Sequence, residues 1–402
     1  MNRSEKMIVA LTGCSHALSH GYQLIFPTVL LLLQKEFSAG YLELGVVGNV
    51  MSLAYGLGAL PAGMIYNRLG PKKLFLFCFF GSSMFSFLVA ASPSLILFTA
   101  GLTFLGALGS IYHPLANALI TAKVRGYGKA LGIHGAIGNI GLTMTPLIAG
   151  LIASSLGWRH VYLWFAMPGI ILSLWALSVD MSSRPHLQEG DNPSLRQESL
   201  GKRLRIYFSL PLVILYIINI LHHFCFQGAI TFLPTYLAKR TSFHLFSLDS
   251  VAIGGMLSAI VLSMGVFGQY GGGVLSQKSR LERNFLLITI IVFPTIFIMS
   301  FTTDFLLLAL TLLYFTFLFF LQPINNTLLA RHTTAPMRGT AFGIYFFSAF
   351  AIGSLASSYS GFVAQTFGLQ WVFLGLSGSA FLLIFFALFL LKVKESIGPS
   401  HS

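Results

Sequence analysis

Residues 15–27 read Ser15-His16-Ala17-Leu18-Ser19-His20-Gly21-Tyr22-Gln23-Leu24-Ile25-Phe26-Pro27, and they lie inside an apolar run that extends over residues 8–34. Ionisable side chains are costly in such a run and usually have a function there. Because His16 and His20 are four residues apart, a helix places both rings on one face. Thr12 and Gln23 extend the same stripe. We therefore predict a membrane helix with one polar face.

The outline of this stretch returns in the second half of the chain. The residues His16, Gly21, Pro27 and Thr28 match His223, Gly228, Pro234 and Thr235, each at an offset of 207. Further matches follow in order: His113-Pro114 with Gln322-Pro323 at 209, and Gly150 and Gly157 with Gly361 and Gly368 at 211. Ordered matches with so little drift indicate a duplication. An even number of helices per copy gives parallel repeats, which is one of the architectures of secondary transporters.

Composition fits a membrane protein. Only 9% of the residues are charged and 55% are hydrophobic, whereas soluble domains carry about 25% charged residues. A helix that spans a bilayer needs roughly 20 mostly apolar residues. Twelve such runs are expected at 8–34, 42–66, 73–92, 95–121, 129–155, 159–180, 207–237, 251–274, 284–302, 304–330, 340–364 and 371–391. We predict an all-α integral membrane protein with twelve transmembrane helices in two parallel-repeat six-helix bundles, 1–180 and 207–402, joined by a linker at 181–206.

The basic residues that give the chain its net charge of +13 lie mostly on one side of the predicted membrane. Of the 24 Lys and Arg residues, only Lys35, Arg159, Lys239 and Arg240 fall on one side of the predicted membrane, and the other 24 − 4 = 20 fall on the opposite side. The positive-inside rule places that richer side, with both termini and the linker, in the cytoplasm. The basic charge therefore argues for anionic lipid as a partner and against nucleic acid.

Histidine is the ionisable residue left for a site inside the membrane. Every Asp and Glu falls in a loop, a tail or a helix end, and no Lys or Arg falls at mid-membrane depth. A histidine titrates near pH 6.5, so it is suited to carrying protons. The ordinary alternative for each is a buried neutral ring bonded to a carbonyl. The candidate substrate- or proton-binding residues are His16, His20, Gln23, His113, Asn117, His134, His223, Gln227, Gln322 and Asn326.

Two choices narrow this set. His222 and His223 are adjacent and cannot both face a cavity, and the repeat favours His223. Histidines four residues apart on a helix can ligate a metal, but no Cys or carboxylate accompanies them, so we expect no fixed metal. Cys14, Cys78 and Cys225 lack metal-ligand or disulfide spacing. No nucleophile–base pair or phosphate loop indicates an enzyme, and we expect no cofactor beyond a proton gradient.

Two stretches of the sequence carry motifs of a known family. The loop Gly63-Met64-Ile65-Tyr66-Asn67-Arg68-Leu69-Gly70-Pro71-Lys72-Lys73 is similar to the signature loop of the major facilitator superfamily, with Asn67 where aspartate is usual. Gly141-Leu142-Thr143-Met144-Thr145-Pro146-Leu147-Ile148-Ala149-Gly150 resembles the motif of its antiporters, with Thr145 and Ala149 replacing two glycines. The resemblance implies a gating loop of Gly63, Asn67, Arg68, Gly70, Lys72 and Lys73. It also implies that the first, fourth, seventh and tenth helices line the cavity.

Glycines on the fifth predicted helix are expected to serve packing. Gly132, Gly135, Gly138 and Gly141 recur at three-residue spacing, and small residues let membrane helices approach closely. We expect this run to pack against the other half of the protein. Gly138, Gly141, Pro146 and Gly150 are the packing residues that we single out.

A narrower resemblance is to the fosmidomycin-resistance-like branch. The residues that carry it are His16, Ser19, Gly21, Tyr22, Pro27, Gln34-Lys35-Glu36-Phe37 and Tyr112-His113-Pro114. This chain has His20 where the branch usually has aspartate, and Leu115 where it often has an acidic residue. The resemblance implies a monomeric, proton-coupled antiporter in the bacterial cytoplasmic (inner) membrane that exports a small organic molecule such as a drug. The alternatives are a proton symporter or facilitator that imports a nutrient, and a non-transporting sensor.

Overall fold

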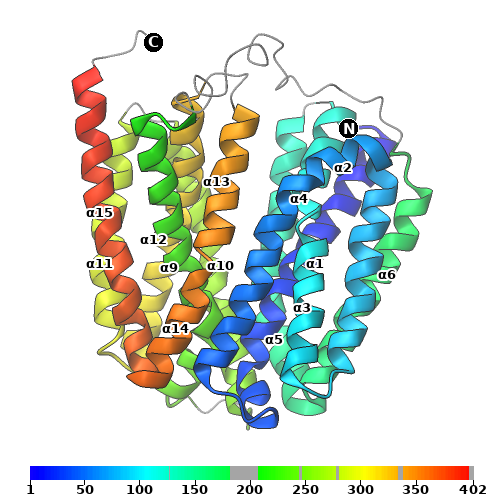
Figure 1. Cartoon of the computed structure of the whole chain (residues 1–402), viewed down its shortest axis with the longest axis horizontal. Coiled ribbons are helices and arrows are strands. Elements are labelled where there is room, and N and C mark those ends of the chain that lie inside the picture. Colours follow the sequence, from blue (N-terminus) through cyan, green and yellow to red (C-terminus); the bar gives the residue numbers. More distant parts are fainter. Residues whose placement is uncertain (126, 182–206, 244–246, 278–279, 334–337, 398–402) are drawn as a thin grey trace.

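The computed structural model describes residues 1–125, 127–181, 207–243, 247–277, 280–333 and 338–397. Within these ranges it does not describe the side chains of 59–68, 128, 338–339 and 394–397. The predicted linker falls almost wholly outside the described residues. Figure 1 shows two groups of helices side by side, with both chain termini at the same end of the molecule.

The described residues form helices and no strands. The first group contains α1 (Arg3–Glu36), α2 (Tyr41–Ala90), α3 (Leu95–Gly109), α4 (Tyr112–Lys123), α5 (Tyr127–Leu156) and α6 (Trp158–Ser178). The second contains α9 (Leu210–Arg240), α10 (Ser250–Ser276), α11 (Leu281–Met299), α12 (Asp304–Arg331), α13 (Arg338–Ile352), α14 (Leu355–Thr366), the short η2 (Leu369–Trp371) and α15 (Val372–Ile397). The predicted all-α membrane fold is confirmed.

Three details differ from the predicted helices. The expected loop between 66 and 73 is a sharp kink inside α2, at Gly70, with φ 75° and ψ 162°. Only glycine adopts this backbone region readily, and Pro71 then begins the next helical segment, where its fixed φ suits a first turn. The predicted helix 95–121 breaks between α3 and α4, and 340–364 breaks between α13 and α14. The first break places Tyr112 and His113 at the start of α4.

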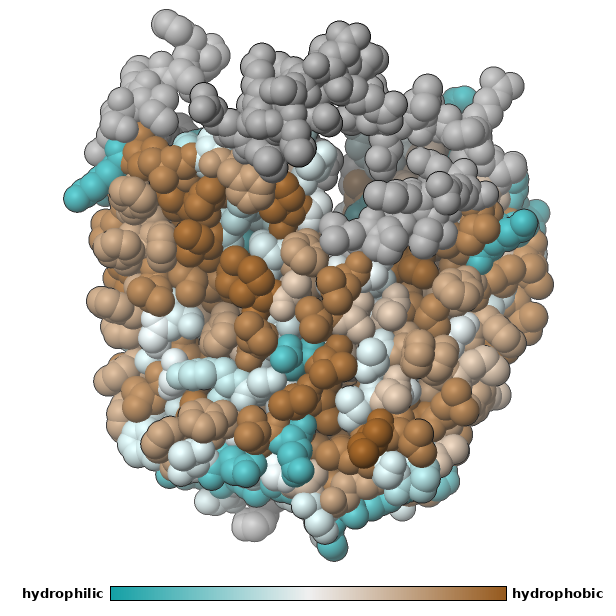
Figure 2. Space-filling model, viewed as in Figure 1, coloured by the Kyte–Doolittle hydropathy of each residue, from teal (hydrophilic) through white to brown (hydrophobic). Residues whose placement is uncertain are grey.

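Ten segments among the described residues are long and apolar enough to cross a membrane. The helix α1 and the first part of α2 are not among the ten. The first of these carries the polar stripe, and part of the second has undescribed side chains. Figure 2 shows a broad apolar surface over the sides of the bundle, with hydrophilic residues toward both ends. This distribution is what a bilayer solvent requires.

The two halves meet at a pair of equivalent glycine crossings. A Cβ at Gly45 of α2 would overlap the carbonyl oxygen of Ser357 and lie 3.1 Å from the Cα of Gly361 in α14. A Cβ at Gly255 of α10 would overlap the carbonyl oxygen of Pro146 and lie 3.2 Å from the Cα of Gly150 in α5. Gly150 and Gly361 are repeat partners, and Gly45 and Gly255 share the offset of 210. The duplicated chain thus builds one close backbone contact twice.

Polar contacts between the halves lie in the same region. Tyr41 OH is 2.6 Å from Lys239 Nζ, the Leu42 amide donates to Gln365 Oε1 at 2.9 Å, and Ser354 Oγ donates to Asn49 Oδ1 at 2.8 Å. These residues lie in the first turns of α2, at the end of α9 and in or next to α14. We call this end of the bundle, opposite the chain termini in Figure 1, the closed end.

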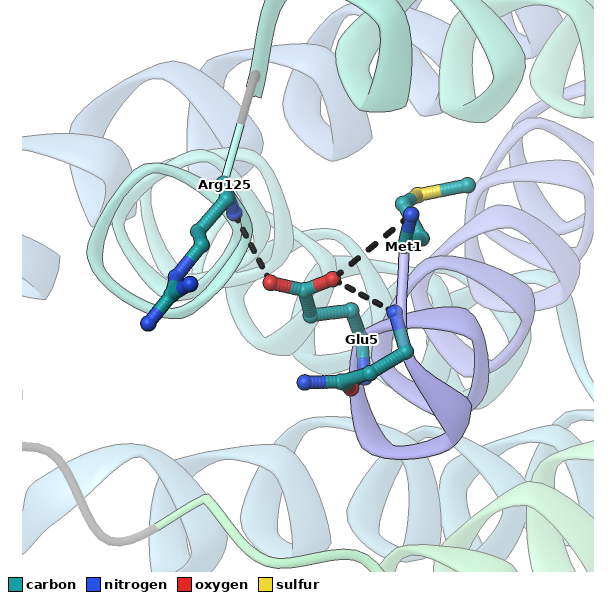
Figure 3. Close-up of polar contacts among 4 residues, drawn as sticks. Met1, Glu5 and Arg125 are labelled. Atoms are coloured by element: carbon teal, nitrogen blue, oxygen red, sulfur yellow. Dashed lines mark hydrogen bonds and ion pairs between the residues drawn. The ribbon is translucent and has the colours of Figure 1, made fainter.

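Glu5 joins the start of α1 to the segment before α5 (Figure 3). Its carboxylate accepts from the Asn2 amide at 2.7 Å and from the Arg125 amide at 3.1 Å, and it lies 3.9 Å from the N-terminal amine. The hydrogen bonds to the Arg125 and Asn2 amides lower the pKa of Glu5. The capping box with Asn2 fixes where α1 begins.

Candidate functional site

Four histidine rings gather where α1, α4 and α5 meet. The ring centroid of His16 lies 4.7 Å from that of His20, 5.0 Å from His113 and 4.4 Å from His134. The centroids of His20 and His113 are 6.0 Å apart. We call these four residues the histidine cluster. Three of the rings are half-buried, whereas His134 is buried.

Close packing of α1 on α5 assembles the cluster. A Cβ at Gly138 would overlap the imidazole of His16, and one at Gly141 would overlap the backbone of Ala17. The absence of side chains there brings His16 Nδ1 within 3.2 Å of the carbonyl oxygen of His134. That geometry assigns the proton to Nδ1 and leaves Nε2 of His16 free to accept one.

Tyr112 of α4 packs against the histidine cluster and is hydrogen-bonded to α1. Its hydroxyl donates to the carbonyl oxygen of Thr12, one turn before His16. Its ring lies 5.7 Å from that of His16 and 6.1 Å from that of His134, in a stacked arrangement with the latter. The break between α3 and α4 comes just before Tyr112, so the first turn of α4 presents Tyr112 and His113 to α1.

Mutual repulsion limits the charge that the cluster holds. Two unit charges about 5 Å apart repel by about 3 kcal/mol at an effective dielectric constant of about 20. No Asp or Glu falls at mid-membrane depth in the sequence to offset a second charge. The arrangement therefore suits one excess proton shared among the rings rather than several held at once.

His223 lies apart from the cluster, in the other half. Its ring is 4.6 Å from Phe350 and 6.3 Å from Phe226, and its buried Nε2 has no hydrogen-bond partner among the described residues. Tyr55 and Phe350 separate the two sites, since Tyr55 lies 6.4 Å from His113 and 5.1 Å from Phe350. The neighbouring His222 instead bonds the carbonyl oxygen of Leu318 at 3.1 Å.

The predicted amides occupy several places. Gln227 Nε2 donates to Ser52 Oγ of the other half at 3.0 Å, and Gln322 is exposed and accepts from Gln269 at 3.4 Å. Gln269 also accepts from Asn139 at 3.0 Å, which joins α5 to α10. Asn117 is exposed and Asn326 is half-buried. Gln23 donates to the Ser19 carbonyl oxygen at 3.5 Å.

The gating-loop residues are described in part. Gly63, Asn67 and Arg68 fall in 59–68, where the structure describes only the course of the helix. Lys72 Nζ donates to the carbonyl oxygen of Leu177 at 2.9 Å, and Lys73 is exposed. A lysine at the last turn of α6 suits the negative end of the helix dipole.

The packing partner predicted for the glycines of α5 is wrong in part. Gly138 and Gly141 contact α1 of their own half, and a Cβ at Gly132 or Gly135 would meet nothing within 4 Å. Contact with the other half comes lower on α5, from Pro146 and Gly150 at the crossing with α10. The glycines near the cluster therefore shape the histidine site.

Sequence reasoning missed Tyr55 and Ser19 as part of the site. Asn49, Ser52 and Tyr55 interrupt the apolar run of the second predicted helix at three-residue spacing, which was an available signal. Among the described residues, no group of three His, Cys, Asp or Glu residues is arranged to hold a metal.

Two duplicated helical halves that meet at paired glycine crossings form an architecture known from membrane transporters. The chain matches the family model described as Major Facilitator Superfamily over residues 11–358, and it belongs to that family. It is therefore a multi-pass membrane transporter and not an enzyme.

Relatives of the chain are named for several different substrates. The chain is 29% identical to "Multidrug resistance protein MdtG" of Serratia proteamaculans, over 44% of each chain. It is 25% identical to "Probable sulfoacetate transporter SauU" of Cupriavidus necator, over 78% of each. It is also 25% identical to "Probable L-galactonate transporter" of Escherichia coli, over 36% of this chain and only 32% of that protein.

Solved structures share the fold. The bacterial homologue of the human lysosomal transporter Spinster, in an inward-facing and occupied conformation, superposes with a TM-score of 0.84 at 15% identity, over 100% of both chains. A mutant form of the nucleoside transporter NupG gives 0.80 at 15% identity, over 96% of this chain and 100% of that one.

Proposed function

We propose that the protein is a proton-coupled exporter of a small organic molecule, located in the bacterial inner membrane with both termini in the cytoplasm. The histidine cluster carries the proposal. It is the one gathering of more than two histidine rings within the described membrane helices, and α1, which carries His16 and His20, also contacts α9 of the other half. The cavity would bind one proton on the cluster and one substrate molecule in alternation, not both at once.

The polar groups on the candidate helices favour a substrate with little net charge. Asn117 and Gln322 present exposed amides, and no Lys or Arg falls at predicted mid-membrane depth in the sequence to clamp a phosphate or a strong acid. The similarity to a protein named for multidrug resistance agrees with an amphipathic organic substrate. The resemblance of residues 15–37 and 112–114 to the fosmidomycin-resistance-like branch favours export.

Variants of His20 test the proton role. His20→Gln installs the residue that stands at the matching position of the other half, Gln227, so it keeps hydrogen bonding and removes titration. Transport of Hoechst 33342 into inside-out vesicles, driven by an acidic interior, should fall at least tenfold. Counterflow of the same dye at equal pH should stay within twofold, because exchange moves no net proton.

His160→Gln is the matched control, since His160 is exposed at the start of α6 and outside the cluster. It should transport like the parent. Full pH-driven transport by His20→Gln would overturn the proton role. A parent protein that gives no flux of any compound in a broad library screen would favour a sensor.

A proton symporter that imports an organic acid is the second candidate. The relatives named for sulfoacetate and L-galactonate motivate it, because a protonated histidine cluster would be the one cation available to such a substrate. Accumulation in cells separates the two: deletion of the gene raises the internal level of an exported substrate and lowers that of an imported one.

A further inference from the structure

A small cavity lies inside the first half, next to the histidine cluster. Residues of α1, α2 and α3 line it, among them Ser19, Gln23, Met51, Tyr55, Cys78 and Gly109. It offers about 10 Å³ for the centre of a water molecule, which is close to the room that one buried water needs.

Two orphaned hydroxyls face this space. Ser19 is 4% exposed and Tyr55 is 6% exposed, and neither hydroxyl has a hydrogen-bond partner among the described residues. Gln23 lines the same cavity as these two residues. A buried hydroxyl without a hydrogen-bond partner is destabilising, so a water molecule that bonds both hydroxyls would stabilise the folded protein.

Tyr55 connects the cavity to the histidine cluster and to the other half of the protein. Its ring contacts His113 of the histidine cluster on one side and Phe350 of the other half on the other. Phe350 also packs on Gly56, where a Cβ would lie 2.7 Å from it. Tyr55 is thus the side chain that touches both the cluster and the inter-half contact.

We propose that this cavity binds one water molecule, which holds the Tyr55 hydroxyl against Ser19 and Gln23, and that Tyr55 is the positioning residue through which the cluster acts on the contact between halves. The second part rests on the proposed proton coupling. The ligand is water itself, and its binding requires no charge change.

Radiolytic labelling in H₂¹⁸O tests the water in the full-length protein reconstituted in nanodiscs. Met51 and Cys78 line the cavity and are 5% and 1% exposed, so bulk water does not reach them readily. Cys225 and Met299 are each 0% exposed, lie elsewhere in the protein and serve as controls of the same residue types. We expect at least fivefold faster ¹⁸O incorporation at Met51 and Cys78 than at the controls. Equal slow labelling at all four residues would overturn the water site.

Gly109→Ala narrows the cavity without a clash, since its Cβ would lie 3.5 Å from the Tyr55 ring, an ordinary contact distance. Labelling of Met51 and Cys78 should fall at least threefold in this variant. Labelling that is unchanged in Gly109→Ala would show that the water lies elsewhere and would overturn the site.

Tyr55→Phe tests the coupling role in proteoliposomes, with Hoechst 33342 as substrate and a pH-sensitive dye as proton reporter. We expect at least a fivefold drop in protons moved per substrate, with downhill substrate flux within twofold of the parent. Tyr22→Phe is the control, because Tyr22 also lines the cavity but its hydroxyl donates to the carbonyl oxygen of Phe165 at 3.1 Å.

The two proposals fail separately. An unchanged proton-to-substrate ratio in Tyr55→Phe, with loss of coupling in His20→Gln, would overturn the Tyr55 role and leave the proton role of the cluster intact. An unchanged ratio in His20→Gln would instead overturn the proposed function.

Discussion

Gly255→Ala should open the closed end of the bundle. The new Cβ would overlap the carbonyl oxygen of Pro146 and crowd the Cα of Gly150, both of which are backbone atoms of the other half. Overpacking of this kind costs about 1–3 kcal/mol. If the cost falls only on conformations in which the crossing is made, the ratio of open to closed molecules at this end rises roughly 5- to 150-fold.

Spin-label distances measure this ratio. Ser38 and Phe367 are exposed on opposite halves at the closed end. Spin labels are attached at these two positions in a chain whose three native cysteines are replaced by alanine. We expect a population with a longer distance between the labels, and this population should be larger in Gly255→Ala than in the parent. Gly45→Ala should behave alike, because the repeat places Gly45 in the equivalent crossing.

The control is Gly135→Ala, whose Cβ would meet nothing within 4 Å. It should leave the distance distribution unchanged. If Gly255→Ala also superimposes on the parent, the crossing is not a constraint on the closed end and the reasoning from backbone contact is refuted.

Two further predictions concern the end that carries the termini. Glu5→Gln removes a carboxylate whose pKa is lowered in the folded protein. The stabilisation is therefore present above the unfolded pKa of about 4.3 and is lost as pH falls through the folded value. Thermal unfolding in detergent should show a lower melting temperature for Glu5→Gln at pH 7 and a shrinking difference below about pH 4; a difference independent of pH would contradict this. Arg68→Ala, in the predicted gating loop, should lower the turnover of Hoechst 33342 several-fold with little change in its half-saturating concentration, and a large loss of affinity at unchanged turnover would count against a gating role.

Periodicity and repeats predicted the fold because each membrane helix is a long apolar run that needs no tertiary information. The breaks within the helices are harder to predict from the sequence. Gly70 ends a helix by its backbone angles rather than by a polar loop, and the sequence on either side continues the helical pattern. A loop was therefore predicted where the chain turns at a single residue.

The candidate site was predicted as a list of residues and not as an arrangement. His16, His20, His113 and His134 were each named, but their assembly depends on Gly138, which admits the imidazole of His16 against α5. Spacing along one helix does not reveal which glycine faces which neighbour. The repeat predicts that His223 faces the cavity, whereas Tyr55 and Phe350 lie between its ring and the cluster, since aromatic residues on other helices fill that space.

The paired glycine crossings have a kinematic consequence. Two rigid bodies that touch at two points turn most freely about the line that joins those points. While Gly45 stays on Gly361 and Gly150 stays on Gly255, that line acts as an axle through the closed end. Relative motion of the halves is then reduced to one rotational degree of freedom, which opens or narrows the opposite end without sliding. Because the two crossings are equivalent in the repeat, duplication of one ancestral helix contact produces both contact points on this axis.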